Sequence, residues 1–327
     1  MKPQQTVIAV LGPTASGKSA LGIELALKLN GEIINCDSVQ VYREIQIATA
    51  KVPLAERRGV PHHLIDFVSP EVNYSAGEWA REAVREIREI QGRERIPILV
   101  GGTGFYLRAL RQPLFPSPQT DTKLRRRLNE IRQRRGTEHL YGLLKRLDPV
   151  SARQLYPRDW PRVQRAIEVY LQTGQRLSVQ NRFRPEPSPG VEHMRVVALN
   201  PPRLALYRRI NARTETHFAG GLVEEVRQLL GQGIPPESNA LGAHGYRRVV
   251  EYLQSRRDLA SAIEQTKLDV RHYAKRQLTW LRREADVEWF AGFGDDPAIQ
   301  GRVFEALNTQ VPQKQHKVSS PSSRISG

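Results

Sequence analysis

The chain has 327 residues and a formal net charge of +16 at pH 7. This length exceeds that of a usual single domain, and so large an excess of positive charge indicates a polyanionic partner, with nucleic acid as the first candidate. The single cysteine, Cys36, excludes a disulfide framework and a cysteine-based zinc site. No stretch approaches the ~20 apolar residues of a membrane span, so we expect a cytoplasmic protein without a membrane partner.

The first predicted element is a buried strand over residues 7–11, followed by a glycine-bounded loop and by a helix over 20–29. The loop matches G-x-x-x-x-G-K-[ST], a motif whose backbone N–H groups and following helix bind a diphosphate. In this motif Lys18 reaches the outer phosphate oxygens and the Ser19 hydroxyl binds Mg²⁺. The predicted diphosphate-binding residues are Gly12, Pro13, Thr14, Ala15, Ser16, Gly17, Lys18 and Ser19.

A second strand is predicted over residues 32–36, and Asp37 follows at its carboxyl end. Ligands bind at that end of open parallel α/β sheets, so we expect Asp37 to face the phosphate-binding loop. Its carboxylate could hold Mg²⁺ through water or accept a proton from a nucleophile. The alternative role is that of a helix N-cap, which Ser38 could fill equally well.

Two further strands are predicted in this half of the chain, separated by a helix over 76–91. The first covers residues 62–66, where His62 and His63 point to opposite faces of a strand and are expected to be structural rather than a metal pair. The second covers 96–100 and is apolar throughout, as in a strand buried on both faces. It leads into Gly-Gly-Thr-Gly, which places the hydroxyl of Thr103 at the same edge of the sheet.

The middle of the chain differs in composition. Residues 113–118 are proline-rich, 121–180 are predicted to be helical, and residues 185–190 form a linker before a strand over 194–199. Residues 121–165 carry a net charge of +8, which favours contact with a phosphate backbone over solvated helix faces. We therefore predict an α/β, P-loop NTPase-like parallel sheet core (1–115 and 191–309), an all-helical insertion domain (116–190) and a disordered tail (310–327).

The last third is predicted to be helical, with helices over 203–230, interrupted at 220–226, and over 271–283. A loop through residues 235–247 separates them. The second helix has a basic face that carries Tyr273 and Trp280. These aromatic residues either stack on nucleic acid or belong to the core.

Several blocks of sequence, taken together, resemble the bacterial tRNA dimethylallyltransferases over roughly residues 6–290. The blocks occur in the order of that family. They are GPTASGKS at 12–19, DS at 37–38 before YR at 42–43, TAK at 49–51, HHLID at 62–66, VGGTG at 100–104 before YL at 106–107, and YAKRQ at 273–277 with TW at 279–280.

The resemblance implies transfer of a dimethylallyl group from dimethylallyl diphosphate to N6 of adenosine-37, next to the anticodon of tRNA. It implies a helical insertion that embraces the anticodon stem, and we expect the enzyme to be a monomer that uses Mg²⁺. Asp37 would be the general base, Thr103 would position the reacting groups, and Arg213 would neutralise charge on the diphosphate. The tRNA-binding residues it implies are Asp37, Ser38, Val39, Gln40, Thr103, Arg125, Pro161, Arg162, Val163, Gln164 and Arg165.

Two stretches, residues 43–48 and 242–246, differ from the family pattern, as does the pair His217-Phe218. We interpret these differences as affecting substrate preference rather than the type of reaction.

Two other functions remain open on the residues alone. A P-loop small-molecule or nucleotide kinase or ATPase also needs a strand-end carboxylate for Mg²⁺, which Asp66 could supply, but it does not need the basic insertion. A nucleotide-switched RNA-binding protein explains the charge but gives no reason for Asp37 and Thr103 at neighbouring strand ends.

Overall fold

A computed structural model describes residues 6–115, 118–182, 186, 191 and 194–308. The predicted tail and parts of both boundaries of the insertion lie outside these residues. Within them, no helix is both long and apolar enough to cross a membrane.

The centre of the molecule is a six-stranded sheet in the order β3-β2-β4-β1-β5-β6, in which all neighbouring pairs are parallel. This confirms the predicted parallel α/β core. The strands are β1 (Val7–Leu11), β2 (Gly31–Cys36), β3 (His62–His63), β4 (Ile96–Gly101), β5 (Met194–Leu199) and β6 (Val287–Phe290).

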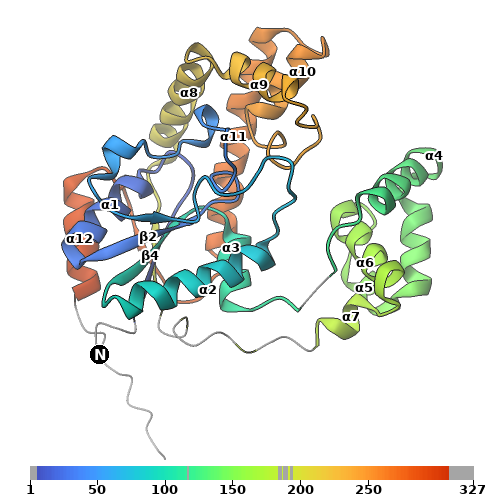
Figure 1. Cartoon of the computed structure of the whole chain (residues 1–327), viewed down its shortest axis with the longest axis horizontal. Coiled ribbons are helices and arrows are strands. Elements are labelled where there is room, and N and C mark those ends of the chain that lie inside the picture. The colour runs from blue at the N-terminus through green and yellow to red at the C-terminus, as the bar shows by residue number, and fades with distance from the viewer. Residues whose placement is uncertain (1–5, 116–117, 183–185, 187–190, 192–193, 309–327) are drawn as a thin grey trace, which may run out of the picture.

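Helices cover both faces of this sheet, which is why β1 is apolar throughout and fully buried. Val7, Ala9 and Leu11 face one hydrophobic cluster, which contains Trp79 and Ile87 of α2 (Ala76–Gly92). The alternate residues of β1 face a second cluster formed with α1 (Lys18–Leu29) and α12 (Pro297–Asn308). Figure 1 shows α1 and α12 on one side of the sheet and α2 and α3 (Gly104–Arg111) on the other.

A group of four helices extends from the core, above the sheet in Figure 1. Its helices contact one another and close over the strand ends that carry the loops described below. The members are α8 (Arg203–Ala219), α9 (Leu222–Gly231), α10 (Tyr246–Leu253) and α11 (Leu259–Leu281).

The segment between α3 and β5 is all-helical in its described residues and stands to one side of the core in Figure 1. Its own hydrophobic cluster contains Leu128, Leu144, Trp160 and Ile167. The helices are α4 (Thr122–Leu147), kinked at Gly136, α5 (Pro149–Gln154), α6 (Trp160–Thr173) and α7 (Leu177–Gln180).

Three sequence-based predictions of elements were wrong in part. The strand predicted over 62–66 ends at His63, because Leu64 and Asp66 have positive φ angles of 57° and 55° that leave the extended region. The last third is not entirely helical, since β6 forms the edge of the sheet. The helix predicted from residue 271 begins at Leu259, where Asp258 caps it by accepting a hydrogen bond from the Ser261 N–H.

Candidate functional site

The phosphate-binding loop connects β1 to α1 in the strand-loop-helix arrangement that its motif requires. Ala15 and Gly17 adopt the left-handed conformation, with φ angles of 63° and 82°, and α1 begins at the next residue, Lys18. The amino end of α1 therefore points its unpaired N–H groups and its positive dipole end at the loop. This is a preformed anion-binding site.

Lys18 lies in this loop with its ammonium group withdrawn from water. Burial, opposed by the attraction of Asp37 and assisted by the nearby Arg213, lowers the pKa of Lys18 to about 8. The Lys18 Nζ atom donates a hydrogen bond to the carbonyl oxygen of Pro13, at 3.3 Å. An anion bound in the loop would compensate the desolvated charge, so the loop is built to accept one.

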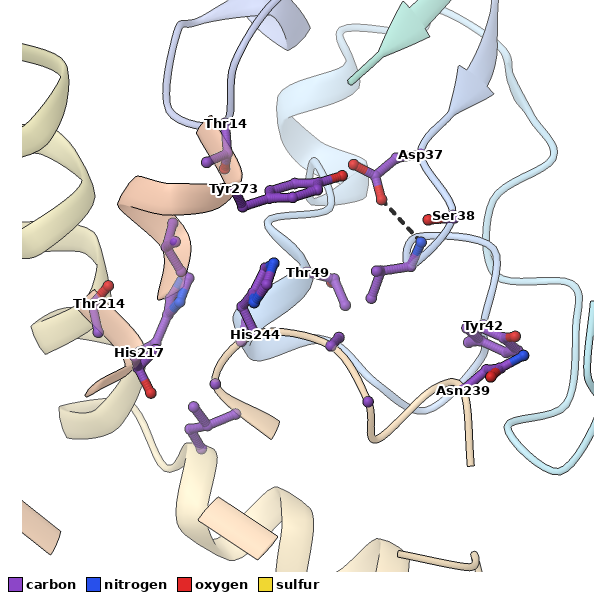
Figure 2. Close-up of a pocket in the computed structure, with 18 of the residues that line it drawn as sticks. Thr14, Asp37, Ser38, Tyr42, Thr49, Thr214, His217, Asn239, His244 and Tyr273 are labelled. Atoms are coloured by element: carbon purple, nitrogen blue, oxygen red, sulfur yellow. Dashed lines mark hydrogen bonds between the residues drawn. The ribbon is translucent and has the colours of Figure 1, made fainter. Parts of the chain in front are cut away.

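Asp37 and Thr103 lie side by side because β2 and β4 are neighbours and Cys36 pairs with Gly101. The Ser38 N–H donates to Thr103 Oγ1 at 3.0 Å, and the Thr103 hydroxyl lies 3.3 Å from Ser38 Oγ, to which it donates. Asp37 Oδ1 accepts a hydrogen bond from the Val39 N–H at 2.9 Å, the dashed line in Figure 2. Asp37 therefore orders a tight local turn and does not cap a helix.

One small cavity brings Lys18, Ser19 and Asp37 together at the carboxyl edge of the sheet. Hydroxyl and carboxylate oxygens are the hard ligands that Mg²⁺ prefers, and Mg²⁺ normally keeps several waters besides them. The donor set of this cavity therefore fits a magnesium ion held by Ser19 and, directly or through water, by Asp37.

Helix α11 supplies two residues to the site that sequence reasoning did not assign. Gln277 accepts a hydrogen bond from the Thr14 N–H at 2.8 Å and donates to the Gly102 carbonyl at 3.0 Å, so it joins the two loops. A Cβ on Gly102 would lie 2.1 Å from Gln277 Nε2, so a side chain there would break this contact. The Tyr273 hydroxyl forms a hydrogen bond with the side chain of Thr103. Burial is the main cause that raises the pKa of Tyr273, and the negative charge of Asp37 raises it further.

Helix α8 brings a second basic group to the phosphate-binding loop. Arg213 donates to the Thr14 hydroxyl, and burial lowers the pKa of its guanidinium. One turn later, burial and the charge of Arg213 lower the pKa of His217 to about 4, so this imidazole is neutral at pH 7. The positive charge at this end of the site is thus provided by Arg213 and Lys18, while His217 contributes an uncharged wall.

A cavity of about 490 Å³ opens from these groups (Figure 2). Its polar end is formed by Thr14, Asp37 and Arg213, and Figure 2 shows the Tyr273 ring lying beside Asp37. The remainder of the wall is mixed, with small or apolar residues such as Val39, Ala48, Phe218, Leu222 and Val270 and polar residues such as Tyr42, Thr49, Glu237, Asn239 and His244. Such a cavity accepts a molecule with an anionic end and a body that carries both apolar and polar groups.

The two stretches that differ from the family pattern meet in one wall of this cavity. Glu225 of α9 accepts hydrogen bonds from the N–H groups of Gln46 and Ile47, at 3.1–3.2 Å, and from the Tyr246 hydroxyl at 2.5 Å. The same Tyr246 hydroxyl accepts from the Ala48 N–H at 3.3 Å. Glu225 therefore holds the start of the 3₁₀ helix η2 (Ile47–Thr49) against the loop that precedes α10.

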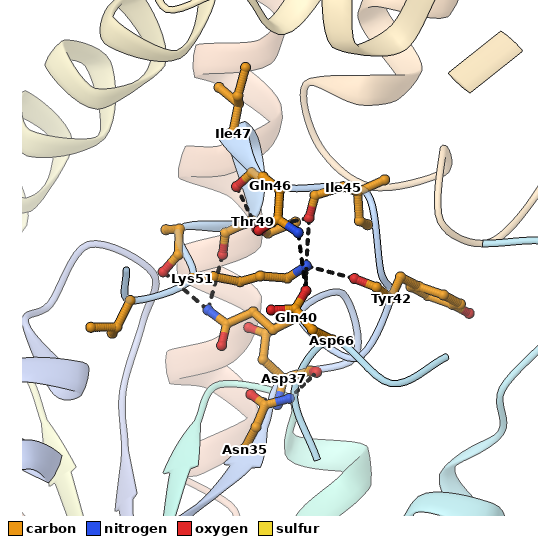
Figure 3. Close-up of polar contacts among 12 residues, drawn as sticks. Asn35, Asp37, Gln40, Tyr42, Ile45, Gln46, Ile47, Thr49, Lys51 and Asp66 are labelled. Atoms are coloured by element: carbon orange, nitrogen blue, oxygen red, sulfur yellow. Dashed lines mark hydrogen bonds and ion pairs between the residues drawn. The ribbon is translucent and has the colours of Figure 1, made fainter. Parts of the chain in front are cut away.

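Lys51 holds the other end of the same loop. Figure 3 shows its ammonium group donating to the carbonyl oxygens of Tyr42 and Ile45, at 2.6 and 2.7 Å, and to Asp66 Oδ1. Burial lowers the pKa of Lys51, although the Asp66 carboxylate opposes this. Asp66 therefore pairs with Lys51 and does not extend to the phosphate-binding loop. The kinase alternative needs a carboxylate there to bind Mg²⁺. The strand-end histidines do not form a pair: His63 contacts Glu32 and Glu86, whereas His62 Nδ1 lies 2.8 Å from the Val60 carbonyl oxygen.

The predicted tRNA-binding residues of the insertion have different environments. Arg125 makes a two-point ion pair with the fully buried Glu168, at 2.7 and 2.8 Å, and Arg165 lies 3.5 Å from the same carboxylate. Arg162 is 74% exposed and pairs with Asp159 at 3.2 Å, and Pro161 is exposed beside it. Val163 and Gln164 are buried, and Gln164 donates a hydrogen bond to the Arg125 carbonyl, so neither side chain is exposed for contact with RNA in this structure.

The chain is similar to known proteins over most of its length. The model of the IPP transferase family matches residues 40–284. The chain belongs to the IPP transferase family. It is 45% identical to a tRNA dimethylallyltransferase of Solibacter usitatus over 92% of this chain and 97% of that one, and 45% identical to one of Geobacter metallireducens over 91% and 96%.

Solved structures of IPP transferases have the same fold. The full-length tRNA isopentenylpyrophosphate transferase of Bacillus halodurans aligns with a TM-score of 0.67 at 36% identity, covering 93% of this chain and 95% of that one. A eukaryotic dimethylallyltransferase described as acting on tRNA aligns with a TM-score of 0.72 at 31% identity, covering 90% and 75%. The family match ends at residue 284, so β6 and α12 lie beyond it.

Proposed function

We propose that the protein is a tRNA dimethylallyltransferase, which transfers the dimethylallyl group of dimethylallyl diphosphate to N6 of adenosine-37 of tRNA and releases diphosphate. The observation that carries this proposal is the cavity in which the phosphate-binding loop, Arg213 and Asp37 converge. Membership of the IPP transferase family and the curated relatives at 45% identity support it.

The phosphate-binding loop serves this reaction by stabilising a leaving group. The N6 amine of adenine is a weak nucleophile because its lone pair is delocalised into the ring, so departure of the diphosphate must be assisted. Lys18, Arg213 and the amino end of α1 place positive charge where negative charge develops on the departing oxygens. A magnesium ion held by Ser19, and by Asp37 only through water so that the carboxylate stays free to accept a proton, would add charge to the same oxygens. No nucleotide needs to be hydrolysed.

In this proposal Asp37 takes the proton of the attacking amine. In the proposed role its carboxylate accepts that proton as N6 bonds to the allylic carbon. Thr103 and Tyr273 position the reacting groups. Because N6 lies inside a stacked loop, the adenosine must turn out of the stack to reach the cavity. The cavity wall formed by Asp37, Ser38 and Val39 is the expected contact with the flipped nucleotide, while Gln40 holds the adjoining loop by donating to the Thr49 carbonyl.

The insertion supplies the long-range part of tRNA recognition in this proposal. Its exposed arginines suit contact with the anticodon stem, since backbone phosphates are recognised mainly by charge. We further propose that the enzyme works in the cytoplasm as a monomer. Light scattering of the purified protein with and without tRNA tests the oligomeric state.

The function is tested by incubating the protein with unmodified tRNA and Mg²⁺ together with either allyl-labelled dimethylallyl diphosphate or γ-labelled ATP. We expect label to enter RNA only from the allyl donor and, after digestion, to be found in N6-isopentenyladenosine. Transfer of label from ATP to any acceptor, or an RNA left unlabelled by the allyl donor, would overturn the proposal in favour of the kinase or the binding-protein alternative.

A further inference from the structure

The turn between β6 and α12, residues 292–296, lies directly against the outer side of the phosphate-binding loop. The Gly294 N–H donates a hydrogen bond to the carbonyl oxygen of Ser16, at 2.8 Å. A Cβ on Gly17 would lie only 2.7 Å from the backbone nitrogen of Asp295. The Asp295 carboxylate oxygen Oδ1 lies equally close to that position, at 2.7 Å, and the Gly294 nitrogen lies at 2.9 Å, so this closeness and the positive φ of 82° exclude any residue but glycine at position 17.

Helix α8 fixes the turn in place. Arg209 Nη1 lies 2.8 Å from both carboxylate oxygens of Asp295, and its guanidinium group lies 3.6 Å from the centroid of the Phe293 ring. Phe293 and Ala15 pack against the same apolar cluster, which includes Ile210. The turn is thus joined to α8 by an ion pair, a cation–π contact and apolar packing.

The same helix also holds the inner side of the phosphate-binding loop. Arg213, four residues after Arg209 and hence on the same face of α8, donates to the Thr14 hydroxyl. One face of α8 therefore contacts both the loop and the turn that supports it.

The hydrogen bond to Ser16 has a consequence for the site. The carbonyl of Ser16 and the N–H of Gly17 belong to one trans peptide unit, in which the two groups point in opposite directions. Because Gly294 holds the carbonyl outward, the Gly17 N–H is directed inward, where a phosphate is expected. Loss of the turn would allow this peptide unit to rotate and would remove one donor from the anion-binding site.

We propose that Arg209, Phe293 and Asp295 form a positioning clamp that keeps the phosphate-binding loop in its anion-binding geometry. This inference rests on the proposed function, because it assumes that the loop holds the diphosphate. The clamp residues Phe293 and Asp295 lie beyond residue 284, where the family match ends.

The clamp acts on the binding of a diphosphate and not on the transferred proton or on tRNA. An exposed ion pair makes a modest contribution, and both partners here are nearly half exposed. We therefore expect Asp295→Asn to raise the dissociation constant for inorganic pyrophosphate, and the KM for dimethylallyl diphosphate, by about 3- to 5-fold. The value of kcat and the affinity for tRNA should stay within about 2-fold, as when uniform binding is removed.

The test measures pyrophosphate binding by calorimetry, with Mg²⁺, for the unaltered protein, Asp295→Asn, Arg209→Gln and the double variant. If the two side chains act as a pair, Asp295→Asn has no further effect in the Arg209→Gln background. Glu288→Gln is the matched control, since it breaks the ion pair between Arg195 and Glu288 on β6, away from the loop. That variant should bind pyrophosphate as the unaltered protein does.

Separate outcomes distinguish this inference from the proposed function. Loss of pyrophosphate binding in Lys18→Ala, with unaltered binding in both Asp295→Asn and Arg209→Gln, overturns the clamp and leaves the proposed function standing. Equal weakening by Asp295→Asn and Glu288→Gln also overturns the clamp, because the effect is then a general one on the sheet edge. A protein that binds no pyrophosphate before any substitution overturns both.

Discussion

Asp37 has a task that a neutral side chain of the same shape cannot perform. Asparagine at this position can still accept the hydrogen bond from the Val39 N–H, so the turn that follows β2 should keep its form. It cannot accept a proton from the amine. We therefore expect Asp37→Asn to bind tRNA normally but to transfer the dimethylallyl group more slowly, by roughly 10²–10⁴-fold under single-turnover conditions. Turnover close to that of the unaltered protein would remove Asp37 from the role of general base.

Lys18 gives the site a pH dependence whose direction follows from its pKa. With a pKa of about 8 in the free protein, Lys18 is mostly neutral at pH 9, and a bound diphosphate favours its charged form. Binding at that pH should therefore take up a proton, and pyrophosphate affinity should fall as the pH rises through about 8.

Calorimetry at pH 9 in buffers of different ionisation enthalpy measures this proton uptake. Lys18→Arg is the control, because arginine stays charged throughout this range while the ionisation of pyrophosphate itself is common to both proteins. The same proton uptake in both proteins would show that Lys18 is not the group that titrates.

Sequence alone predicts site residues that follow neighbouring strands, but not those that a distant helix brings to the site. Asp37 and Thr103 follow neighbouring strands of a parallel sheet, so topology alone places them at one edge. Gln277 and Tyr273 come from a helix that packs on the site from the far end of the chain. Their four-residue spacing signals only a helix face, and the contact between Gln277 and Thr14 depends on long-range packing that no local pattern encodes.

Among the elements, the loop containing η2 is held in place mainly by hydrogen bonds to one carboxylate, that of Glu225. Glu225→Gln replaces an acceptor of three hydrogen bonds by an amide whose N–H₂ group faces other donors. We expect faster hydrogen exchange at the amides of residues 46–48 and a fall in kcat/KM of about 10-fold, because Ala48 and Thr49 line the cavity.

The neighbouring residue provides a matched control for this change. Glu224 lies on the same helix, but its side-chain carboxylate contacts only the exposed Arg227 among the residues described by the structure. Glu224→Gln should leave exchange and catalysis within about 2-fold. If both variants behaved alike, the loop would be held by its other contacts, such as those of Lys51.

The elements themselves were predictable where their pattern is strong. The four central strands are largely buried and rich in Val, Ile and Leu, and the sequence locates them to within about a residue. The edge strand β6 was missed because it has only four residues, of which Glu288 is exposed. The prediction missed the start of α11 at Leu259, although Asp258 with Ser261 gives a recognisable capping signal.

At the scale of the whole molecule, the insertion keeps its own core while presenting positive charge. Its composition predicted a basic helical unit, but composition could not separate arginines that face RNA from arginines that stabilise the fold. Arg125 belongs to the second group in the free protein, because Glu168 is fully buried and depends on it and on Arg165. Removing either arginine leaves a buried carboxylate with fewer donors, which costs about 1–3 kcal/mol.

The difference between fold-stabilising and exposed arginines determines which variants can measure the contribution of the insertion to tRNA binding. Arg125→Gln should lower the thermal stability of the insertion, so a loss of tRNA binding in that variant would not identify a phosphate contact. Arg162 is 74% exposed and paired only loosely with Asp159, so Arg162→Gln should leave the fold intact. If Arg162 contacts a phosphate, its loss should make the slope of log affinity against log salt shallower by about 0.7–0.9.

Arg227→Gln is the matched control for this prediction, because Arg227 is also an exposed arginine in an (i, i+3) ion pair, but on α9 of the core. Filter binding of tRNA across a salt titration compares the two variants, and pyrophosphate binding should be unchanged in both, since neither residue lies near the phosphate-binding loop. A slope that is the same in Arg162→Gln as in Arg227→Gln would mean that the amino end of α6 does not reach the RNA. The positive charge that binds the stem would then have to come from the exposed arginines of α4.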